Sequence, residues 1–476
     1  MSQSTFSSTI HPWAVLNGVR FGSAHIGPTP GHSSRGSALL ATADLPEAGG
    51  LLLVVPRDLV LSRETVLETA KADRGLAELL EATREWATTP RLTILLFLLH
   101  LTTTRTSHSS RFTTYLSSLP TPPLPTLWPE HQVNFLSGTT LASAVTAKLS
   151  TLHREWTTLA SLLADHTPSL LTWTMLDAQY RSRALELPPI GACMAPILDM
   201  ANHASSPNAY YDVSNGDIQL HLHGGAAVAA GEEITISYGS HKGACEMLFS
   251  YGFLPSDMCS AGTLFLPIAL ADDDPLAPAK RAWCTAAPGV RISDAEAKED
   301  EPDAADGEAP RGVTWDSDAL WLAVVNEEDG LSIRAARRLD GRHDLVVLWR
   351  DSEVPHAGAL RPLLEKEELW PVLLLRATVV VRQVVEAQVE GLEGSAGEFE
   401  RAVSEVSDGE DEFGPTGLAR RLRGLELDLL KRAEVSLDGQ IAELMRHPTV
   451  TAYLESMNAD SGAQGEEATE DDDLAH

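Results

Sequence analysis

The spacing of hydrophobic and polar residues changes along the chain, and the changes separate stranded segments from helical ones. Residues 1–62 predict strands and turns, because the apolar run at 51–55 is stopped by Pro56, as expected of a buried strand. From 63 to 187 apolar residues recur at helical spacing, interrupted by a proline-rich break at 120–129. The helical pattern is clearest in three segments, at 94–99, 141–152 and 169–187.

Strand patterns return after residue 189. Asp217 to His223 alternates between polar and apolar residues, which predicts a half-exposed strand, and a Gly-Gly turn follows it. Ile234 to Tyr238 predicts a further strand, and Lys242 to Phe253 predicts a short helix. The pattern therefore indicates one β-rich domain that is interrupted by a helical insertion.

The last third of the chain predicts helices separated by acidic tracts. Two long segments, 364–390 and 418–444, keep helical spacing. Eight of the fifteen residues from 294 to 308 are acidic, which predicts a disordered loop, and a second acidic patch lies at 398–412. The first long segment carries the apolar face that a helix bundle buries: Leu369, Leu373, Ala377, Val381 and Val384.

The net charge of −31 limits the partners that can be expected. Nucleic acids and anionic membranes favour basic surfaces, so we predict binding to neither. An acidic surface is compatible with a basic protein substrate, which it would attract over long range. Solvated acidic tracts account for much of the charge in the simplest interpretation.

The cysteines and the apolar runs indicate a cellular compartment. The four cysteines are widely spaced, and none forms a Cys-x-x-Cys pair, so neither a disulfide framework nor a zinc site is predicted. The N-terminal residues do not show a signal peptide, and the longest apolar run, Ile94 to Leu99, is too short to span a bilayer. We expect a soluble protein of the cytoplasm, the nucleus or both.

Two segments carry the candidate chemistry. Asp199-Met200-Ala201-Asn202-His203 places an Asn-His pair on a loop, and the segment Gly231 to Gly239 carries Tyr238 at the end of a β-branched strand. A hydrolytic triad is not indicated, since no Gly-x-Ser-x-Gly elbow and no plausible cysteine motif is present. We also predict no metal site, because the nearby His221 and His223 lack an evident further ligand. The remaining interpretation is group transfer, in which a tyrosine hydroxyl helps to position donor and acceptor.

Together these segments resemble the motifs of SET-domain protein methyltransferases. Asp199 to His203 resembles the family's Asn-His motif, and Gly231 to Gly239 resembles the strand that carries its catalytic tyrosine. Three further matches occur in the family's order: Gly36 to Thr42 with the N-terminal Gly-x-Gly element, Ser182-Arg183-Ala184 with the Ser-Arg segment, and Tyr251-Gly252-Phe253 with the Tyr-Gly-Phe. The order and the helical insertion are similar to the Rubisco lysine methyltransferase class and its fungal ribosomal-protein and elongation-factor relatives.

The resemblance implies an α+β fold, in which a pseudoknotted, β-rich SET domain with a helical insertion precedes an all-α substrate-binding domain. The expected parts are an N-terminal SET segment (1–62), the insertion (63–188), a C-terminal SET segment (189–256), a linker with the acidic loop (257–309), the helical domain (310–455) and an acidic disordered tail (456–476).

The resemblance also implies S-adenosylmethionine as the cofactor and roles for individual residues. Tyr238 would be the catalytic tyrosine, which aligns the acceptor nitrogen with the sulfonium methyl group. The residues implied to bind the cofactor are Gly36, Ala38, Leu39, Arg183, Asp199, Asn202, His203, Tyr251 and Phe253. The acceptor implied is a lysine of a non-histone protein, for which the resembled class points to the translation machinery, with a histidine acceptor as an alternative.

Two positions depart from the family pattern. Ala38 stands where the second glycine of the Gly-x-Gly element is expected, and its methyl group would crowd a backbone approach to the cofactor. Ala204 follows the Asn-His pair where a serine is common. The departure at Ala38 leaves a second alternative open, a SET-fold interaction protein that has lost catalysis.

Overall fold

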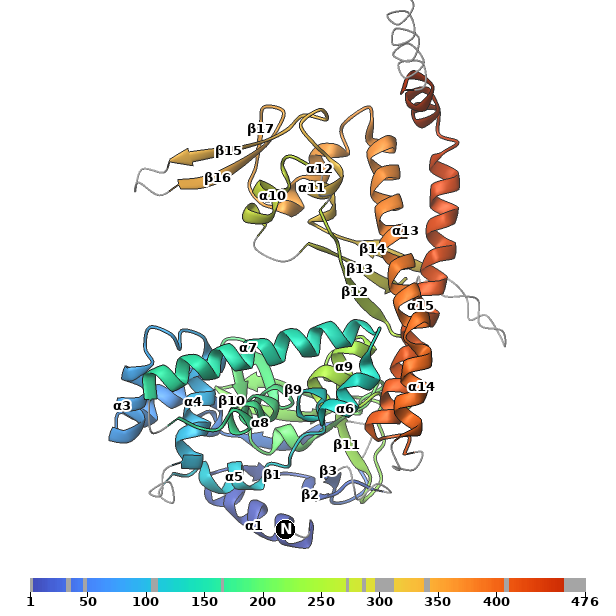
Figure 1. Cartoon of the computed structure of the whole chain (residues 1–476). Coiled ribbons are helices and arrows are strands. Elements are labelled where there is room, and N and C mark those ends of the chain that lie inside the picture. The colour runs from blue at the N-terminus through green and yellow to red at the C-terminus, as the bar shows by residue number, and fades with distance from the viewer. Residues whose placement is uncertain are drawn as a thin grey trace, which may run out of the picture.

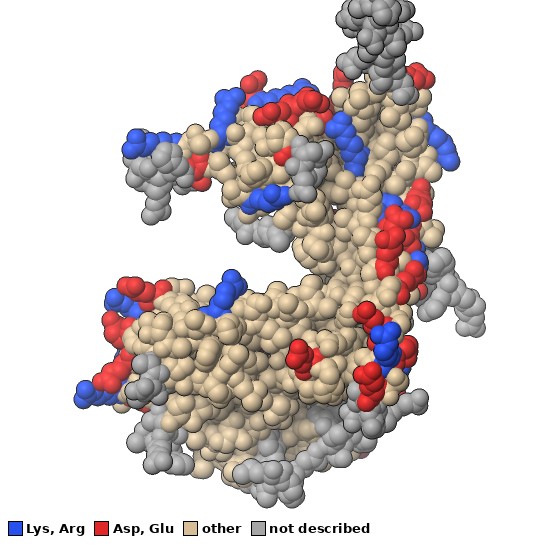
Figure 2. Space-filling model, viewed as in Figure 1, with Lys and Arg blue, Asp and Glu red and all other residues tan. Residues whose placement is uncertain are grey.

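The structure is a computed structural model of the full chain. It describes residues 3–30, 36–45, 49–103, 110–163, 167–270, 274–284, 288–295, 312–337, 343–405 and 411–457. Two lobes are joined along one side by long helices, and the space-filling view shows a deep hollow between them (Figures 1 and 2). Most of the acidic tract at 294–308 and the tail after residue 457 lie outside the described residues, so the disorder predicted there stays a prediction.

The first lobe is built on three small sheets. Their strand orders are β1-β4-β10-β9, β2-β3-β11-β8 and β5-β7-β6. The strands are β1 (Arg20–Phe21), β2 (Ala24–Pro28), β3 (Ser37–Ala41), β4 (Gly50–Val55), β5 (Leu61–Ser62), β6 (Ala184–Leu187), β7 (Gly191–Met194), β8 (Asn202–His203), β9 (Ala209–Ser214), β10 (Asp217–Leu222) and β11 (Glu233–Ile236). Every sheet combines strands from before and after the insertion, which confirms one interrupted β-rich domain.

Helices cover these sheets. Helix α4 (Pro90–Thr103) is buried over most of its length, and α7 (Thr140–Leu163) runs along the surface that faces the hollow (Figure 1). The other helices of this lobe are α1 (Gln3–Leu16), α2 (Arg63–Ala70), α3 (Arg74–Ala82), α5 (Thr113–Ser118), α6 (Glu130–Val133), α8 (Leu170–Arg181) and α9 (Ala244–Tyr251). The helix predicted over 169–187 ends at Arg181, and residues 184–187 form β6 instead, because pairing with β7 satisfies their backbone groups.

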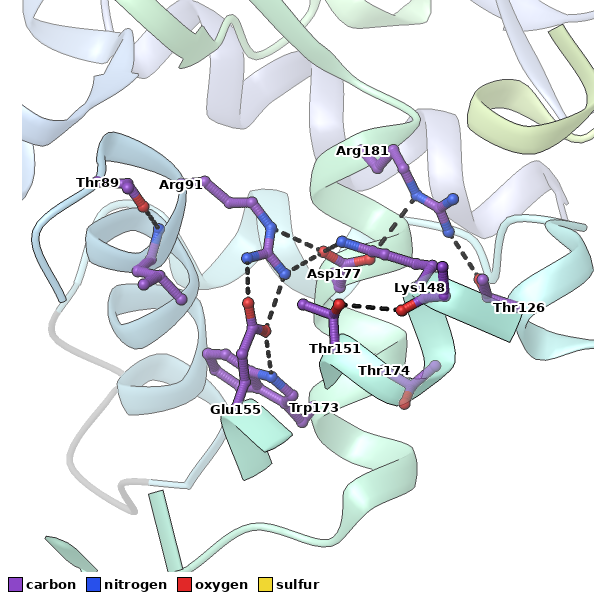
Figure 3. A network of polar contacts seen from close by, with 12 residues as sticks. Thr89, Arg91, Thr126, Lys148, Thr151, Glu155, Trp173, Thr174, Asp177 and Arg181 are labelled. Atoms are coloured by element: carbon purple, nitrogen blue, oxygen red, sulfur yellow. Dashed lines mark hydrogen bonds and ion pairs between the residues drawn. The ribbon is translucent and has the colours of Figure 1, made fainter. Parts of the chain in front are cut away.

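A buried network of charges holds the insertion together (Figure 3). Asp177 on α8 is completely buried and lies within ion-pair distance of three cations, Arg91 at 2.5 Å, Lys148 at 2.8 Å and Arg181 at 3.7 Å. Arg91 also forms two hydrogen bonds to Glu155 on α7, of 2.7 and 3.1 Å. Burial acts to raise the pKa of Asp177, but the surrounding cations lower it overall. The ionised carboxylate therefore ties α4, α7 and α8 into one body.

The second lobe has long helices along its joint with the first lobe, and small sheets with short helices away from the joint. Its long helices α13 (Trp370–Gly394) and α15 (Pro415–Leu444) confirm the helical C-terminal region, with α14 (Ala396–Ser404) between them. It also contains two three-stranded sheets, β12-β13-β14 and β15-β16-β17. The remaining elements are β12 (Thr263–Pro267), α10 (Ala277–Trp283), β13 (Gly289–Asp294), β14 (Val313–Asp316), α11 (Leu320–Val324), β15 (Leu331–Arg337), β16 (His343–Trp349), β17 (Ser352–Val354) and α12 (Arg361–Leu364).

These strands correct two expectations, although the α+β fold class itself is confirmed. The segment 257–309 was expected to be a linker, but it supplies β12 and β13, whose apolar side chains enter the core of the second lobe. The region from 310 was expected to be all-α, but it contains four strands, β14 to β17, before its long helices. On α13, Leu373, Ala377 and Val381 are buried as predicted, whereas Leu369 is 46% exposed because it precedes the first turn.

The lobes are joined at the loop before α7. Glu426 on α15 is completely buried and accepts hydrogen bonds from the Thr140 backbone amide (2.9 Å) and the Thr140 hydroxyl (2.5 Å). Gln388 on α13 donates to the Gly138 carbonyl at 2.8 Å, and Arg423 on α15 donates to the Ser137 carbonyl beside it. These bonds attach α7, at one wall of the hollow, directly to the helices of the second lobe.

No helix among the described residues is long and apolar enough to cross a membrane. The described part of the chain also holds no group of three or more His, Cys, Asp and Glu side chains placed to bind a metal ion.

Candidate active site

The two segments singled out in the sequence lie side by side. Strand β8 runs parallel to β11, with Asn202 opposite Thr235 and His203 opposite Ile236. The chain leaves β11 two residues before Tyr238, whose hydroxyl donates to the Ala201 carbonyl at 3.0 Å. Tertiary structure thus brings the Asn-His pair and the tyrosine into one site.

A second bond fixes the backbone of this tyrosine. The Tyr238 amide donates to Nδ1 of His203 at 3.2 Å, so this nitrogen is an unprotonated acceptor and the neutral ring carries its proton on Nε2. Burial lowers the pKa of His203, which favours the neutral ring near pH 7. His203 therefore orients the tyrosine as well as forming strand β8.

Aromatic rings surround the Tyr238 side chain. The ring centroids of Tyr251 and Phe253 lie 4.5 and 6.4 Å from it, and that of His203 lies 5.4 Å away. Tyr251 and Phe253 flank Gly252, which ends α9 in a left-handed conformation with φ of 81°. A β-carbon at Gly252 would lie 2.8 Å from the Pro123 carbonyl oxygen, so only glycine allows both rings to face the site.

The tyrosines of the site are held as neutral phenols. Burial raises the pKa of Tyr238 well above its usual value, and it also raises the pKa of Tyr251. Both hydroxyls therefore remain hydrogen-bond donors over the range in which the protein would work. The site offers oriented hydroxyl groups in apolar surroundings and no strong nucleophile of its own.

Arg183 and Asp199 form a buried ion pair beneath the tyrosine. Arg183 Nη1 donates to the Asp199 carbonyl at 2.9 Å and to its carboxylate at 3.2 Å. The carboxylate also accepts a 2.5 Å hydrogen bond from Tyr115 on α5. Burial raises the pKa of Asp199, opposed by Arg183 and by the tyrosine hydroxyl. Both predicted residues thus lie at the site, where they hold the loop that leads into β8.

The Asn202 side chain faces the neighbouring strand. Its amide nitrogen donates to the Glu233 carboxylate at 2.6 Å, and Thr29 lies at the limit of hydrogen-bond distance, 3.5 Å. Asn202 and His203 are each partly exposed, so groups on this edge remain accessible. We predict that Asn202 and His203 contact the cofactor, and their partial exposure leaves room for this contact.

The N-terminal element divides into an accessible residue and two buried ones. Gly36 is partly exposed and has a φ of 88°, and among the described residues no atom lies within 4 Å of the position that a β-carbon would take there. Ala38 and Leu39 have no exposed surface, and within β3 they pair with Gly27 and Ile26 of β2. The structure therefore supports cofactor contact at Gly36, and it places Ala38 and Leu39 in the strand behind. The Ala38 methyl group packs inside the protein.

The chemistry of these residues fits S-adenosylmethionine. The open space at Gly36 leaves room for a ligand beside the backbone. Asp199 Oδ1 is buried and has no hydrogen-bond partner among the described residues, so this oxygen can accept a further hydrogen bond. The aromatic side chains offer apolar faces to a flat heterocycle and to a sulfonium group.

The sequence did not indicate two residues that shape the site. Glu233 lies within the tyrosine motif and could have been noticed as the only carboxylate inside the strand that pairs with Asn202. Tyr115 lies 84 positions before Asp199, in a short helix with no motif, and no sequence signal pointed to it.

Comparisons with known proteins agree with this geometry. The model of a family described as cytochrome c lysine N-methyltransferase 1 (Ctm1) matches residues 189–274. SET domain-containing protein 8 of Schizosaccharomyces pombe (strain 972) is 28% identical over 431 residues, which cover 87% of this chain and 91% of that protein. A structure of the SET domain of LSMT bound to lysine and AdoHcy superimposes with a TM-score of 0.62 at 17% identity, covering 93% of both chains. Rubisco LSMT bound to AdoMet gives 0.61 at 17% identity, over 92% of this chain and 93% of that one. The fold indicated by the motifs is confirmed: the chain has the SET-domain architecture of Rubisco LSMT, and over residues 189–274 its sequence is similar to a family of lysine N-methyltransferases.

Proposed function

We propose that this protein methylates a lysine side chain of a non-histone protein, with Tyr238 as the catalytic residue. The observation that carries the proposal is the Tyr238 hydroxyl, which is neutral, fixed on the Ala201 carbonyl and surrounded by aromatic rings. When bound, S-adenosylmethionine supplies a methyl group on a positively charged sulfur. The protein's own task is to present a neutral amine to that methyl group in line.

The residues of the site perform this task in three ways. The rings of Tyr251 and Phe253 exclude water, which disfavours the charged form of a lysine and lowers its pKa, so that the amine can attack. The Tyr238 hydroxyl, held by the Ala201 carbonyl on a backbone that His203 fixes, orients the nitrogen lone pair. The carbonyl oxygens of the 199–203 loop, Ala201 among them, are acceptors for weak contacts from a polarised methyl group.

The acceptor protein is proposed on weaker but independent grounds. The names of the similar proteins mention cytochrome c and Rubisco, which are not histones. A net charge of −31 would attract a basic acceptor over long range. A protein of the translation machinery in the cytoplasm or nucleus remains our proposal for acceptor and location.

A labelling experiment tests this function. The purified chain is incubated with methyl-labelled S-adenosylmethionine and cell lysate, and the labelled band is identified by mass spectrometry, with Tyr238→Phe as the control. We expect one predominant labelled band, label recovered as methyllysine, and none with the variant. Label recovered as methylhistidine would replace lysine by the alternative acceptor. No label together with no calorimetric heat on adding S-adenosylmethionine would support the interaction protein that lacks catalysis.

A further inference from the structure

One buried tyrosine connects the helical insertion to the active-site loop. Tyr115 on α5 has no exposed surface, and its ring stacks on that of Trp13 with centroids 6.0 Å apart. The Trp13 indole also donates to the Arg111 carbonyl at 2.6 Å, so α1 is bonded to the segment just before α5. The position of the Tyr115 hydroxyl is therefore fixed by packing.

That hydroxyl is bonded to the loop that carries the candidate chemistry. It donates to the Asp199 carboxylate at 2.5 Å, while Arg183 binds the Asp199 carbonyl and carboxylate from the other side. Two residues further on, the Ala201 carbonyl accepts the Tyr238 hydroxyl. Two hydrogen bonds and the three-residue backbone segment Asp199-Met200-Ala201 thus join Tyr115 to Tyr238.

We propose that Tyr115 is a positioning residue for methyl transfer: its hydroxyl holds Asp199, and thereby sets the place of the Ala201 carbonyl on which Tyr238 is oriented. The proposal rests on the proposed function, since it assigns a role within that reaction. It means that the insertion takes part in building the active site as well as covering the sheets.

The environment of Asp199 explains why one hydroxyl matters. Its Oδ1 atom has no partner within the described part of the chain, so Tyr115 and Arg183 supply the side-chain hydrogen bonds to the carboxylate. Without the Tyr115 donor the buried carboxylate keeps its bond to Arg183 and its interaction with the Ile197 backbone, but it is held less firmly and takes up a proton more easily. Either change weakens the hydrogen bonds by which Arg183 holds the loop at Asp199.

The pH dependence expected of the contact between Tyr115 and Asp199 follows from the groups around the Asp199 carboxylate. Those groups are Tyr115 from α5, Arg183 from the turn after α8, and Tyr238 from the segment after β11. The hydrogen bond from Tyr115 lowers the pKa of Asp199 against the effect of burial. Its removal raises that pKa further, so the acidic limb of the kcat profile moves to higher pH.

The test compares Tyr115→Phe with Tyr180→Phe in the full chain. The first removes the hydroxyl and keeps the ring on Trp13. Tyr180 is also buried in the insertion, on α8, and its hydroxyl makes no hydrogen bond among the residues that the structure describes. Three quantities are measured: kcat and KM for the labelled acceptor, the pH profile of kcat, and amide hydrogen exchange of residues 199–203.

We expect Tyr115→Phe to lower kcat at least tenfold, with the acceptor KM within about twofold, to shift the acidic limb upward, and to speed exchange at 199–203 about tenfold. Tyr180→Phe should leave all three unchanged. Wild-type kcat and wild-type exchange in Tyr115→Phe would overturn the proposal. So would faster exchange confined to α1 and α5 with kcat per folded molecule unchanged, which indicates a purely structural role. If the wild-type chain transfers no methyl group, the proposed function fails, while the exchange at 199–203 still decides whether Tyr115 positions the loop.

Discussion

The buried carboxyl group at the joint between the lobes gives a prediction with a defined magnitude. Glu426 is surrounded by protein, and burial raises its pKa from 4.5 to about 7, although the Thr140 hydrogen bonds and Arg423 act in the opposite direction. One pKa unit corresponds to about 1.4 kcal/mol, so ionised Glu426 costs the folded state about 3 kcal/mol relative to the protonated acid. We expect Glu426→Gln, which is permanently neutral, to remove this cost.

The sign of the pH dependence follows from the raised pKa. Below pH 4.5 the carboxyl group is protonated in both folded and unfolded chains, and its favourable contribution is fully present. As the pH rises from 4.5 to about 7, the unfolded chain loses this proton first, and the contribution disappears. The Gln amide can accept from the Thr140 amide and donate to the Thr140 hydroxyl, so both contacts across the joint are retained.

Urea unfolding at pH 5 and pH 8 measures the effect. At pH 8 we expect Glu426→Gln to be more stable than the wild-type chain by up to about 3 kcal/mol, and at pH 5 the two should agree within about 1 kcal/mol. Glu443→Gln, an exposed substitution on the same helix, is the matched control and should change little at either pH. A Glu426→Gln chain less stable than wild type at pH 8 would refute the reasoning, because it would show that the joint favours the ionised carboxylate.

Three further substitutions test the site and the fold. Tyr238→Phe should reduce kcat by about 10²–10³-fold, because an oriented hydroxyl is lost, and S-adenosylhomocysteine binding by calorimetry should stay within a few-fold; an active variant would reject the assigned role. Asp177→Asn leaves three partly buried cations without their carboxylate and should lower the free energy of unfolding by about 3–5 kcal/mol; unchanged urea unfolding would contradict this. Gly138→Ala forces a φ of 81° on alanine and places a methyl group 2.6 Å from the Gly391 carbonyl, so we expect a loss of at least about 1–2 kcal/mol. Gly439→Ala, inside α15 with open space around it, should instead be neutral or stabilising, and equal effects of the two would refute the argument.

The spacing of apolar residues predicted a strand correctly where the strand buries one face. It failed where a segment becomes a strand only because a neighbouring strand pairs with it. The alternation at 217–222 predicted β10, whose Ile218, Leu220 and Leu222 are buried. Residues 184–187 are too few to separate a strand from the end of the preceding helix by pattern, and they form a strand because β7 lies beside them. The sheets at 263–354 were missed for the same reason, since their short strands are stable only when paired.

The candidate site could be predicted only in part. Tyr238, Asn202 and His203 were identified because their motif keeps a fixed order in the family, and the structure brings them together. Ala38 raised a doubt about cofactor binding, and the structure shows its methyl group buried within β3. A substitution in a strand cannot be judged from sequence alone, because the same residue faces either the ligand or the core.

The sequence by itself determined the chemistry that is available: a tyrosine at the end of a strand, an Asn-His pair, a Tyr-Gly-Phe segment and a strongly acidic chain. The tertiary structure decided how these groups act, because hydrogen bonds and burial depend on neighbours that are far away along the chain. The Tyr115 hydroxyl reaches Asp199 across 84 positions, and Glu426 reaches Thr140 across 286. Such contacts leave no local pattern, since each requires only one side chain of the right length at the place where two packed elements meet.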